Sequence, residues 1–125
     1  MGKLSREKGA AWERELGHML SDIWPDAKRG IQQTRSASEE ADCSGTPYWV
    51  EAKVGKKQNI RAAMRQALEA TDGRPVVAVV KDNSPGGGKA ADTWACMTLD
   101  DWLDLVAELE VLKNERREQQ ESRKG

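Results

Sequence analysis

The sequence predicts a single α/β (α+β) domain with one central mixed β-sheet flanked by helices. Three observations support this fold class: three segments with helical spacing of apolar residues, a hairpin signal within residues 41–54, and a β-branched run at 75–80. The expected order is helix, three strands, helix, two strands, helix. We expect a domain over residues 1–113 and a charged tail over 114–125, which contains no apolar side chain.

The first helix is expected to run from Ser5, its N-cap, to Trp24, because Pro25 stops it. Its apolar residues recur at helical spacing and predict one buried stripe. They are Trp12, Leu16, Met19, Leu20, Ile23 and Trp24.

The second helix is expected over 60–71, with Asn59 capping its start and Gly73 its end. Its predicted buried face consists of Ile60, Ala63, Met64, Ala67 and Leu68.

The third helix begins near Asp100, with acids in its first turn as the helix dipole favours. Its apolar face is expected to lie in the core, although part of it is a candidate dimer contact. That face consists of Trp102, Leu105, Val106, Leu109 and Leu112.

The strands are expected between and after these helices. Residues 41–44 and 48–54 form a hairpin around Gly45-Thr46-Pro47, after a short strand at 30–34. The run at 75–80 has the pattern of a strand covered on both faces, and residues 93–99 form the last strand. Residues 84–89 lack the spacing of a nucleotide-binding loop, so we expect a connector and no nucleotide cofactor.

Composition excludes some classes of protein. No apolar run approaches the roughly 20 residues needed to span a bilayer, so we expect no membrane association. Cys43 and Cys96 form no metal-type pair and suit a reducing cytosol, where they would stay as thiols. The net charge of -1 divides into +3 over residues 1–89 and -4 over residues 90–125. This distribution is compatible with nucleic-acid binding but does not by itself indicate it.

A set of acids and a lysine carries the expected chemistry. Glu51 and Lys53 share one face of the predicted strand, because side chains alternate along it. Asp42 lies on the preceding strand of the hairpin, within cross-strand reach of Glu51. Glu13 projects into the apolar stripe of the first helix, where a buried carboxylate needs a partner.

Converging carboxylates are typical of a divalent-cation site. We expect Mg²⁺, or Mn²⁺ in its place, to bind Asp42, Glu51 and the backbone carbonyl of Ala52. Glu13 would complete a second metal site or position a water, and Lys53 would stabilise charge in the transition state.

These residues resemble a known family. The arrangement Asp42-(x8)-Glu51-Ala52-Lys53 matches the PD-(D/E)xK nuclease motif, and the segment KGAAWEREL is similar to the first helix of archaeal-type and phage Holliday junction resolvases. The resemblance covers roughly residues 6 to 70. It implies a restriction-endonuclease-like fold and a Mg²⁺-dependent homodimer that resolves four-way DNA junctions by paired nicks. Ala41 replaces the motif's proline, and Ala70 stands where exonuclease-type relatives have tyrosine.

Other residues are expected around this site. Gln66, on the second helix, is expected to approach the site and support it, with a structural hydrogen bond as the alternative. The expected DNA contacts are Arg14, Arg35, Ser36, Lys56, Lys57, Arg61 and Arg65.

Alternatives stay open at this point. Asp42, Glu51 and Lys53 would also suit a surface ion-pair network, and Arg61 and Arg65 a solvated basic face. The first functional alternative is a related nuclease acting on nicked, flapped or duplex DNA in phage replication or packaging. The second is a non-catalytic DNA-binding module.

Overall fold

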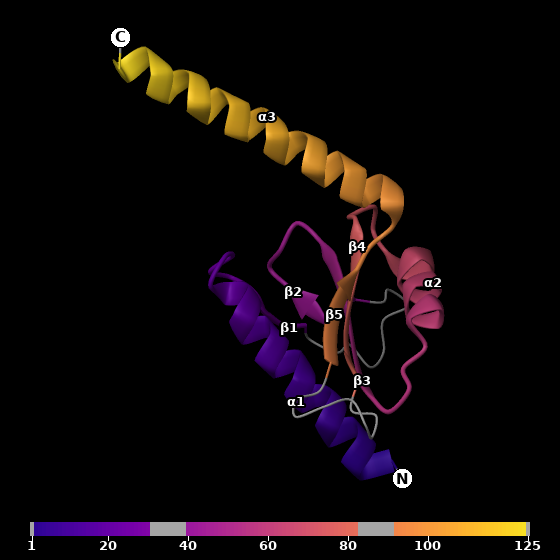
Figure 1. The fold of residues 1–125 in the computed structure, drawn as a ribbon. Coiled ribbons are helices and arrows are strands. Elements are labelled where there is room, and N and C mark those ends of the chain that lie inside the picture. The colour runs from indigo at the N-terminus through magenta and orange to yellow at the C-terminus, as the bar shows by residue number, and fades with distance from the viewer. Residues whose placement is uncertain (1, 31–39, 83–91, 125) are drawn as a thin grey trace.

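A computed structural model describes residues 2–30, 40–82 and 92–124, with the backbone alone for residues 2–5. Five strands form one mixed sheet in the order β1-β2-β3-β4-β5, and three helices accompany it (Figure 1). The helices are α1 (Gly2–Ser21), α2 (Ile60–Ala70) and α3 (Leu99–Lys124). The strands are β1 (Lys28–Arg29), β2 (Cys43–Ser44), β3 (Trp49–Gly55), β4 (Val76–Asp82) and β5 (Asp92–Cys96). The predicted fold class and the order of the elements are confirmed. The first strand, β1, lies before the predicted strand at 30–34, and residues 31–34 are outside the described residues. The end of α2 is capped by Thr71, so the prediction that Gly73 caps it is wrong.

The centre of the sheet is a parallel pair, β3 and β4, connected through α2. Their register runs from Trp49 opposite Val76 to Gly55 opposite Asp82. The connection is long enough for a helix, as a parallel crossover requires. Its start is capped as predicted, because the Asn59 side chain accepts a hydrogen bond from the Ala62 amide at 3.0 Å.

The predicted hairpin is formed by β2 and β3. They pair antiparallel, with Cys43 opposite Val50. Gly45 in the turn has a φ of +82°, and a Cβ there would lie 2.2 Å from the carbonyl oxygen of Asp26. Glycine is therefore required at this point, both for the backbone conformation and for the close approach of the segment that leads into β1.

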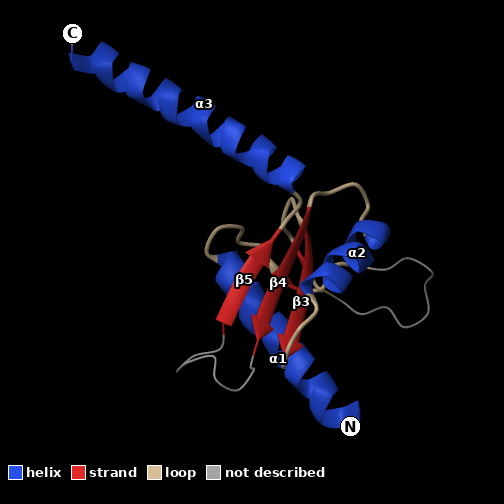
Figure 2. Ribbon diagram, turned by 45° about the vertical axis from the view of Figure 1, so that its right-hand side comes forward, coloured by secondary structure: helices blue, strands red, loops and turns tan. Residues whose placement is uncertain are grey.

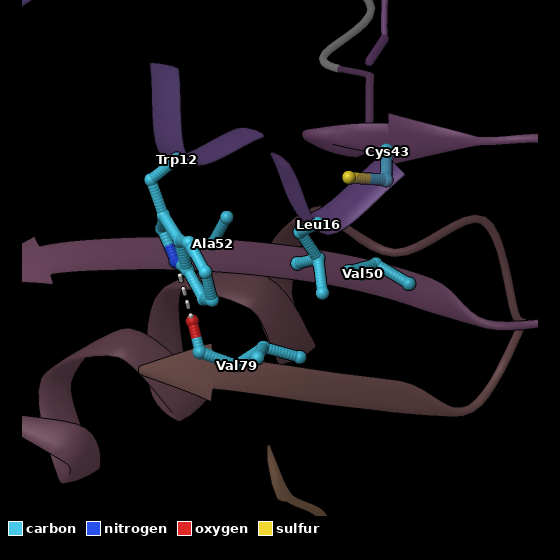
Figure 3. Packing of buried hydrophobic residues seen from close by; sticks show 6 residues of the cluster. All are labelled: Trp12, Leu16, Cys43, Val50, Ala52 and Val79. Carbon is cyan, nitrogen blue, oxygen red and sulfur yellow. Dashed lines mark hydrogen bonds between the residues drawn. The ribbon is translucent and has the colours of Figure 1, made fainter. Parts of the chain in front are cut away.

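One face of the sheet packs against α1. Trp12 and Leu16 lie on Cys43, Val50 and Ala52, together with Val79 of β4 (Figure 3). The Trp12 indole also donates a hydrogen bond of 3.4 Å to the Val79 carbonyl oxygen. Burial of this apolar surface holds α1 across the sheet, and the C-terminal half of α1, which includes Glu13, lies near β1 and β2.

The opposite face packs against α2. Its core combines Trp49 and Val76 with Ala67, and also includes Ala41. Because side chains alternate along β3, Glu51 and Lys53 lie on this same α2 face as Trp49. Figure 2 shows α1 running behind the strands, with α2 beside their other face.

Two of the predicted buried stripes are wider than those observed. Met19 and Ile23 of the first predicted stripe are exposed, and so is Leu68 of the second. α1 begins at Gly2, so Ser5 lies inside it and is not its cap, and α1 ends at Ser21, before the predicted Trp24. Residues 22–24 continue in hydrogen-bonded turns, because the chain already bends there toward β1.

α3 differs most from the expectation. It points away from the sheet (Figures 1 and 2), and none of its residues is buried. The prediction that Trp102 and the leucines of this helix lie in the core is therefore wrong.

The helix also continues to Lys124, so the expected boundary after residue 113 falls within one unbroken helix. In the described part of the chain, no helix is long and apolar enough to cross a bilayer.

Candidate active site

The backbone of Asp42 is held on both sides. Its amide donates to the Val50 carbonyl oxygen at 2.9 Å, and its own carbonyl oxygen accepts from the Gly30 amide at 2.7 Å. A Cβ at Gly30 would lie 2.2 Å from the Ala41 carbonyl oxygen, so the chains approach this closely only with glycine at that position. Asp42 is thereby fixed at the start of β2.

The side chain of Asp42 reaches across to β3. Its Oδ2 accepts a hydrogen bond from the Ala52 amide at 2.8 Å. β3 continues beyond the part that pairs with the short strand β2. There the Asp42 carboxylate, in place of a backbone carbonyl, accepts the hydrogen bond of the Ala52 amide. In a strand, the amide and the carbonyl of one residue point to the same side, so the Ala52 carbonyl is directed to this edge as well.

Glu51 and Lys53 form a pair on the α2 face of β3. Lys53 Nζ lies 3.3 Å from Glu51 Oε1, and the Glu51 side chain is largely buried. Lys53 Nζ also donates to Gln66 Oε1 of α2 at 3.5 Å. The structure therefore brings Gln66 to Lys53, which is compatible with both expectations for Gln66, and this long hydrogen bond contributes to the position of the ammonium group.

Glu13 is buried, as its place in the apolar stripe predicted, and it has a partner. Its Oε2 accepts from Arg29 Nε of β1 at 2.7 Å. A Cβ at Gly17, one helical turn further on, would lie 3.0 Å from the Arg29 backbone nitrogen. α1 thus approaches β1 closely enough for the ion pair to form in a partly buried place.

The electrostatics of Asp42 connect these groups. The pKa of the Asp42 carboxyl is raised from 3.8 to about 6 by several effects together. Burial raises this pKa most, and the hydrogen bond from the Ala52 amide lowers it. The negative charges of Glu51 and Glu13 also raise it, and the positive charge of Lys53 lowers it. Glu13, Glu51 and Lys53 therefore all lie close enough to Asp42 to act on its charge.

The pKa of the Cys43 thiol is also affected by the negative charges of this site. The pKa of its thiol is raised to about 12, mostly by burial and in part by the negative charges of Asp42 and Glu13. The thiol donates to the Glu13 carbonyl oxygen at 3.5 Å. Cys43 is thus a protonated, buried link between α1 and β2 and is no nucleophile.

The donor set is chemically suited to a hard divalent cation. Carboxylate oxygens of Asp42 and Glu51 and the carbonyl of Ala52 are the ligands that Mg²⁺ prefers. A cation between them would also relieve the repulsion that raises the Asp42 pKa. Within residues 2–30, 40–82 and 92–124, however, no three His, Cys, Asp or Glu side chains form a ready metal cluster. Glu13 is paired with Arg29, so the residues fit two carboxylates and a carbonyl, and Glu13 as a direct ligand stays a prediction.

The expected DNA-contacting residues divide into two groups. Arg14, Lys56, Lys57, Arg61 and Arg65 are all exposed, on α1, on the turn after β3 and on α2. Arg35 and Ser36 lie outside the described residues. Exposure is compatible with both phosphate contact and a solvated basic face, so these assignments stay predictions.

Arg29 is the residue that the sequence did not single out. It lies in a polar stretch with no periodicity, next to another basic residue, Lys28. The one available signal was indirect: a carboxylate at position 13 inside an apolar stripe requires a cation from some other element.

No protein-family model, no curated protein and no solved structure matches this chain. The resemblance to PD-(D/E)xK nucleases therefore stays a prediction from the sequence.

Proposed function

We propose that this protein is a Mg²⁺-dependent DNA endonuclease and that four-way junctions are its leading substrate. One observation carries the proposal. Glu51, paired with Lys53, lies close enough to Asp42 for its charge to raise the pKa of the Asp42 carboxyl, in a place where burial is the largest of the effects that raise this pKa to about 6. An ion-pair network on an open surface would not have this property, because water would screen its charges.

The residues have distinct roles in the proposed reaction. Asp42, Glu51 and the Ala52 carbonyl would hold Mg²⁺, which supplies charge neutralisation at the phosphate and a more acidic water. Lys53 presents its ammonium group on the same face, where it stabilises negative charge as the phosphodiester bond breaks. Gln66 helps to orient Lys53, and the Arg29–Glu13 pair fixes α1 beside the site.

Activity is tested with a labelled four-way junction and a linear duplex of the same sequence. Each is incubated with Mg²⁺, with Mn²⁺ and with EDTA. We expect symmetric nicks in the junction with either metal and none with EDTA. If the linear duplex is cleaved at the same rate as the junction, the protein is a general nuclease and the proposed selectivity for junctions is wrong. Binding of DNA without cleavage under every metal condition would remove the enzyme proposal.

The site is tested by removing its charges one at a time. Asp42→Asn and Glu51→Gln should abolish cleavage and leave DNA binding, measured by gel shift without metal, within about threefold, because phosphate contacts remain. The matched controls, Asp22→Asn and Glu69→Gln, change exposed acids and should cleave like the wild type. Wild-type rates in either site variant would exclude this site.

The proposal also has consequences for location and assembly. A DNA endonuclease of this kind acts in the cytoplasm of a prokaryotic or phage-infected cell. Paired nicks in two strands require two active sites, and a chain of 125 residues provides one, so we propose that the active form is a homodimer.

A further inference from the structure

α3 carries an apolar stripe that the rest of the described chain leaves uncovered. Its large members are between 40% and 67% exposed. They are Leu99, Trp102, Leu105, Leu109 and Leu112. At 100° per residue these side chains fall within less than half of the helix circumference, so they form one continuous face.

This helix has little support of its own. It begins with a capped turn, since Thr98 Oγ1 accepts from the Asp101 amide at 3.1 Å, and then extends for 26 residues away from the sheet. Helices in water owe most of their stability to the packing of an apolar face. A projecting helix with half-exposed leucines and a tryptophan therefore indicates that another surface covers the stripe.

The spacing of the stripe identifies a helix as the covering element. Trp102, Leu105, Leu109 and Leu112 alternate steps of three and four, which is the a/d seam of a coiled coil. After Leu112 the same seam positions are Arg116, Gln119 and Arg123. The apolar seam is thus confined to the first half of α3.

The charges of α3 select the direction of the second helix. Residues 99–112 carry five acids and no basic residue, and residues 113–124 carry five basic residues and three acids. A parallel, in-register pair would place Arg116 opposite Arg116 and Arg123 opposite Arg123 along the seam. An antiparallel pair joins the apolar halves and directs each basic half away from the other. The acids of residues 99–112 lie beside those of the second helix in both arrangements, so the basic halves alone distinguish the two directions.

We propose that α3 pairs with α3 of a second copy of this chain, antiparallel, through the segment from Trp102 to Leu112. In this register Trp102 lies beside Leu112 of the other copy, and Leu105 beside its Leu109. A longer overlap would pair more opposite charges but would place leucines against Arg116 and Gln119. Surface ion pairs contribute about 0.2–1 kcal/mol each, less than the 1.5–3 kcal/mol of a buried leucine, so the apolar register is preferred.

The apolar area that the stripe can bury gives an estimate of the dissociation constant of the dimer. Half-exposed side chains of this size from two copies bury on the order of 1,000 Å² in total, which is near the lower limit for a specific interface. We therefore expect a dissociation constant on the order of micromolar.

Sedimentation velocity of the full chain from about 1 to about 300 µM tests the pairing. The wild type should pass from monomer to dimer over this range. Leu105→Glu with Leu109→Glu should weaken dimerisation at least about a hundredfold, because four charges enter the seam of each dimer. The matched control, Leu103→Glu with Val111→Glu, changes similarly exposed residues off the stripe and should dimerise like the wild type.

Two results would overturn the proposal. The first is a wild type that stays monomeric at the highest concentration, which would assign the stripe to a different protein. The second is a dimer that is insensitive to charges in the seam. Far-UV circular dichroism and urea denaturation of each variant check the fold, which should be preserved because no residue of α3 is buried.

Cysteine cross-linking tests the direction, in a Cys96→Ser background. In the antiparallel pair, two copies of position 112 lie about 15 Å apart along the axis, too far for a disulfide. Leu112→Cys alone should therefore stay uncross-linked, and so should Trp102→Cys alone. A mixture of the two variants should form the mixed disulfide. Cross-linking of Leu112→Cys with itself would overturn the antiparallel arrangement.

This inference depends on α3 and not on the proposed nuclease site. A dimer that cleaves no DNA would support the interface and remove the proposed function. A monomer that nicks DNA in the presence of Mg²⁺ would do the reverse.

Discussion

Asp42→Asn should make the protein more stable when no divalent cation is present. The ionised Asp42 carboxylate is partly buried beside two other negative charges, and its pKa rises from 3.8 to about 6. At about 1.4 kcal/mol per pKa unit, the ionised form costs the folded state about 3 kcal/mol relative to the unfolded state. Asparagine removes the charge and keeps an oxygen that accepts the Ala52 amide.

The sign and the pH range follow from proton linkage. Between pH 3.8 and about 6 the folded wild type retains a proton that the unfolded chain has lost, so its stability falls as the pH rises through this range. The full penalty is present above pH 6 and absent below pH 3.8. Asp42→Asn should therefore gain about 2 to 3 kcal/mol at pH 8 and nothing near pH 4.

Urea denaturation in EDTA at pH 8, 6 and 4 measures this difference, with Asp22→Asn as the matched exposed control. The control should stay within about 0.5 kcal/mol of the wild type at each pH. Excess Mg²⁺ should stabilise the wild type and not Asp42→Asn, which narrows the gap between them. Equal or lower stability of Asp42→Asn at pH 8 in EDTA would refute the reasoning, because the carboxylate would then carry no penalty.

Two further predictions concern the surroundings of the site. Arg29→Met should destabilise the fold by about 2 kcal/mol in urea denaturation, because it leaves the buried Glu13 carboxylate without its cation. Lys113→Met, which removes an exposed ion pair, should change stability by less than about 0.5 kcal/mol, and an equal loss in both variants would contradict this view. Arg61→Ala with Arg65→Ala should weaken DNA binding for every sequence and flatten its salt dependence by about one to two phosphate equivalents. An unchanged salt slope would assign both arginines to a solvated face.

Local sequence determined much of the central sheet. Val50, Ala52 and Val54 alternate with Glu51 and Lys53, and this alternation alone sets the two faces of β3, because strand side chains point to opposite sides. The turn at Gly45 and the cap at Asn59 were also readable, since both depend on backbone conformations that few residues supply. The place of Asp42, Glu51 and Lys53 on the hairpin followed from the same alternation and from the turn.

The tertiary structure decided what no local pattern contains, namely which side chains meet across the fold and which faces are covered. The pairing of Glu13 with Arg29 depends on how closely α1 approaches β1, which helical periodicity does not specify. The apolar stripe of α3 has the same spacing whether it covers a core or meets another molecule, so the sequence alone predicted a core helix and the structure leaves the stripe exposed. The physical reason is the same in both cases. Periodicity determines the face that a segment presents, and the remaining elements determine what lies against it.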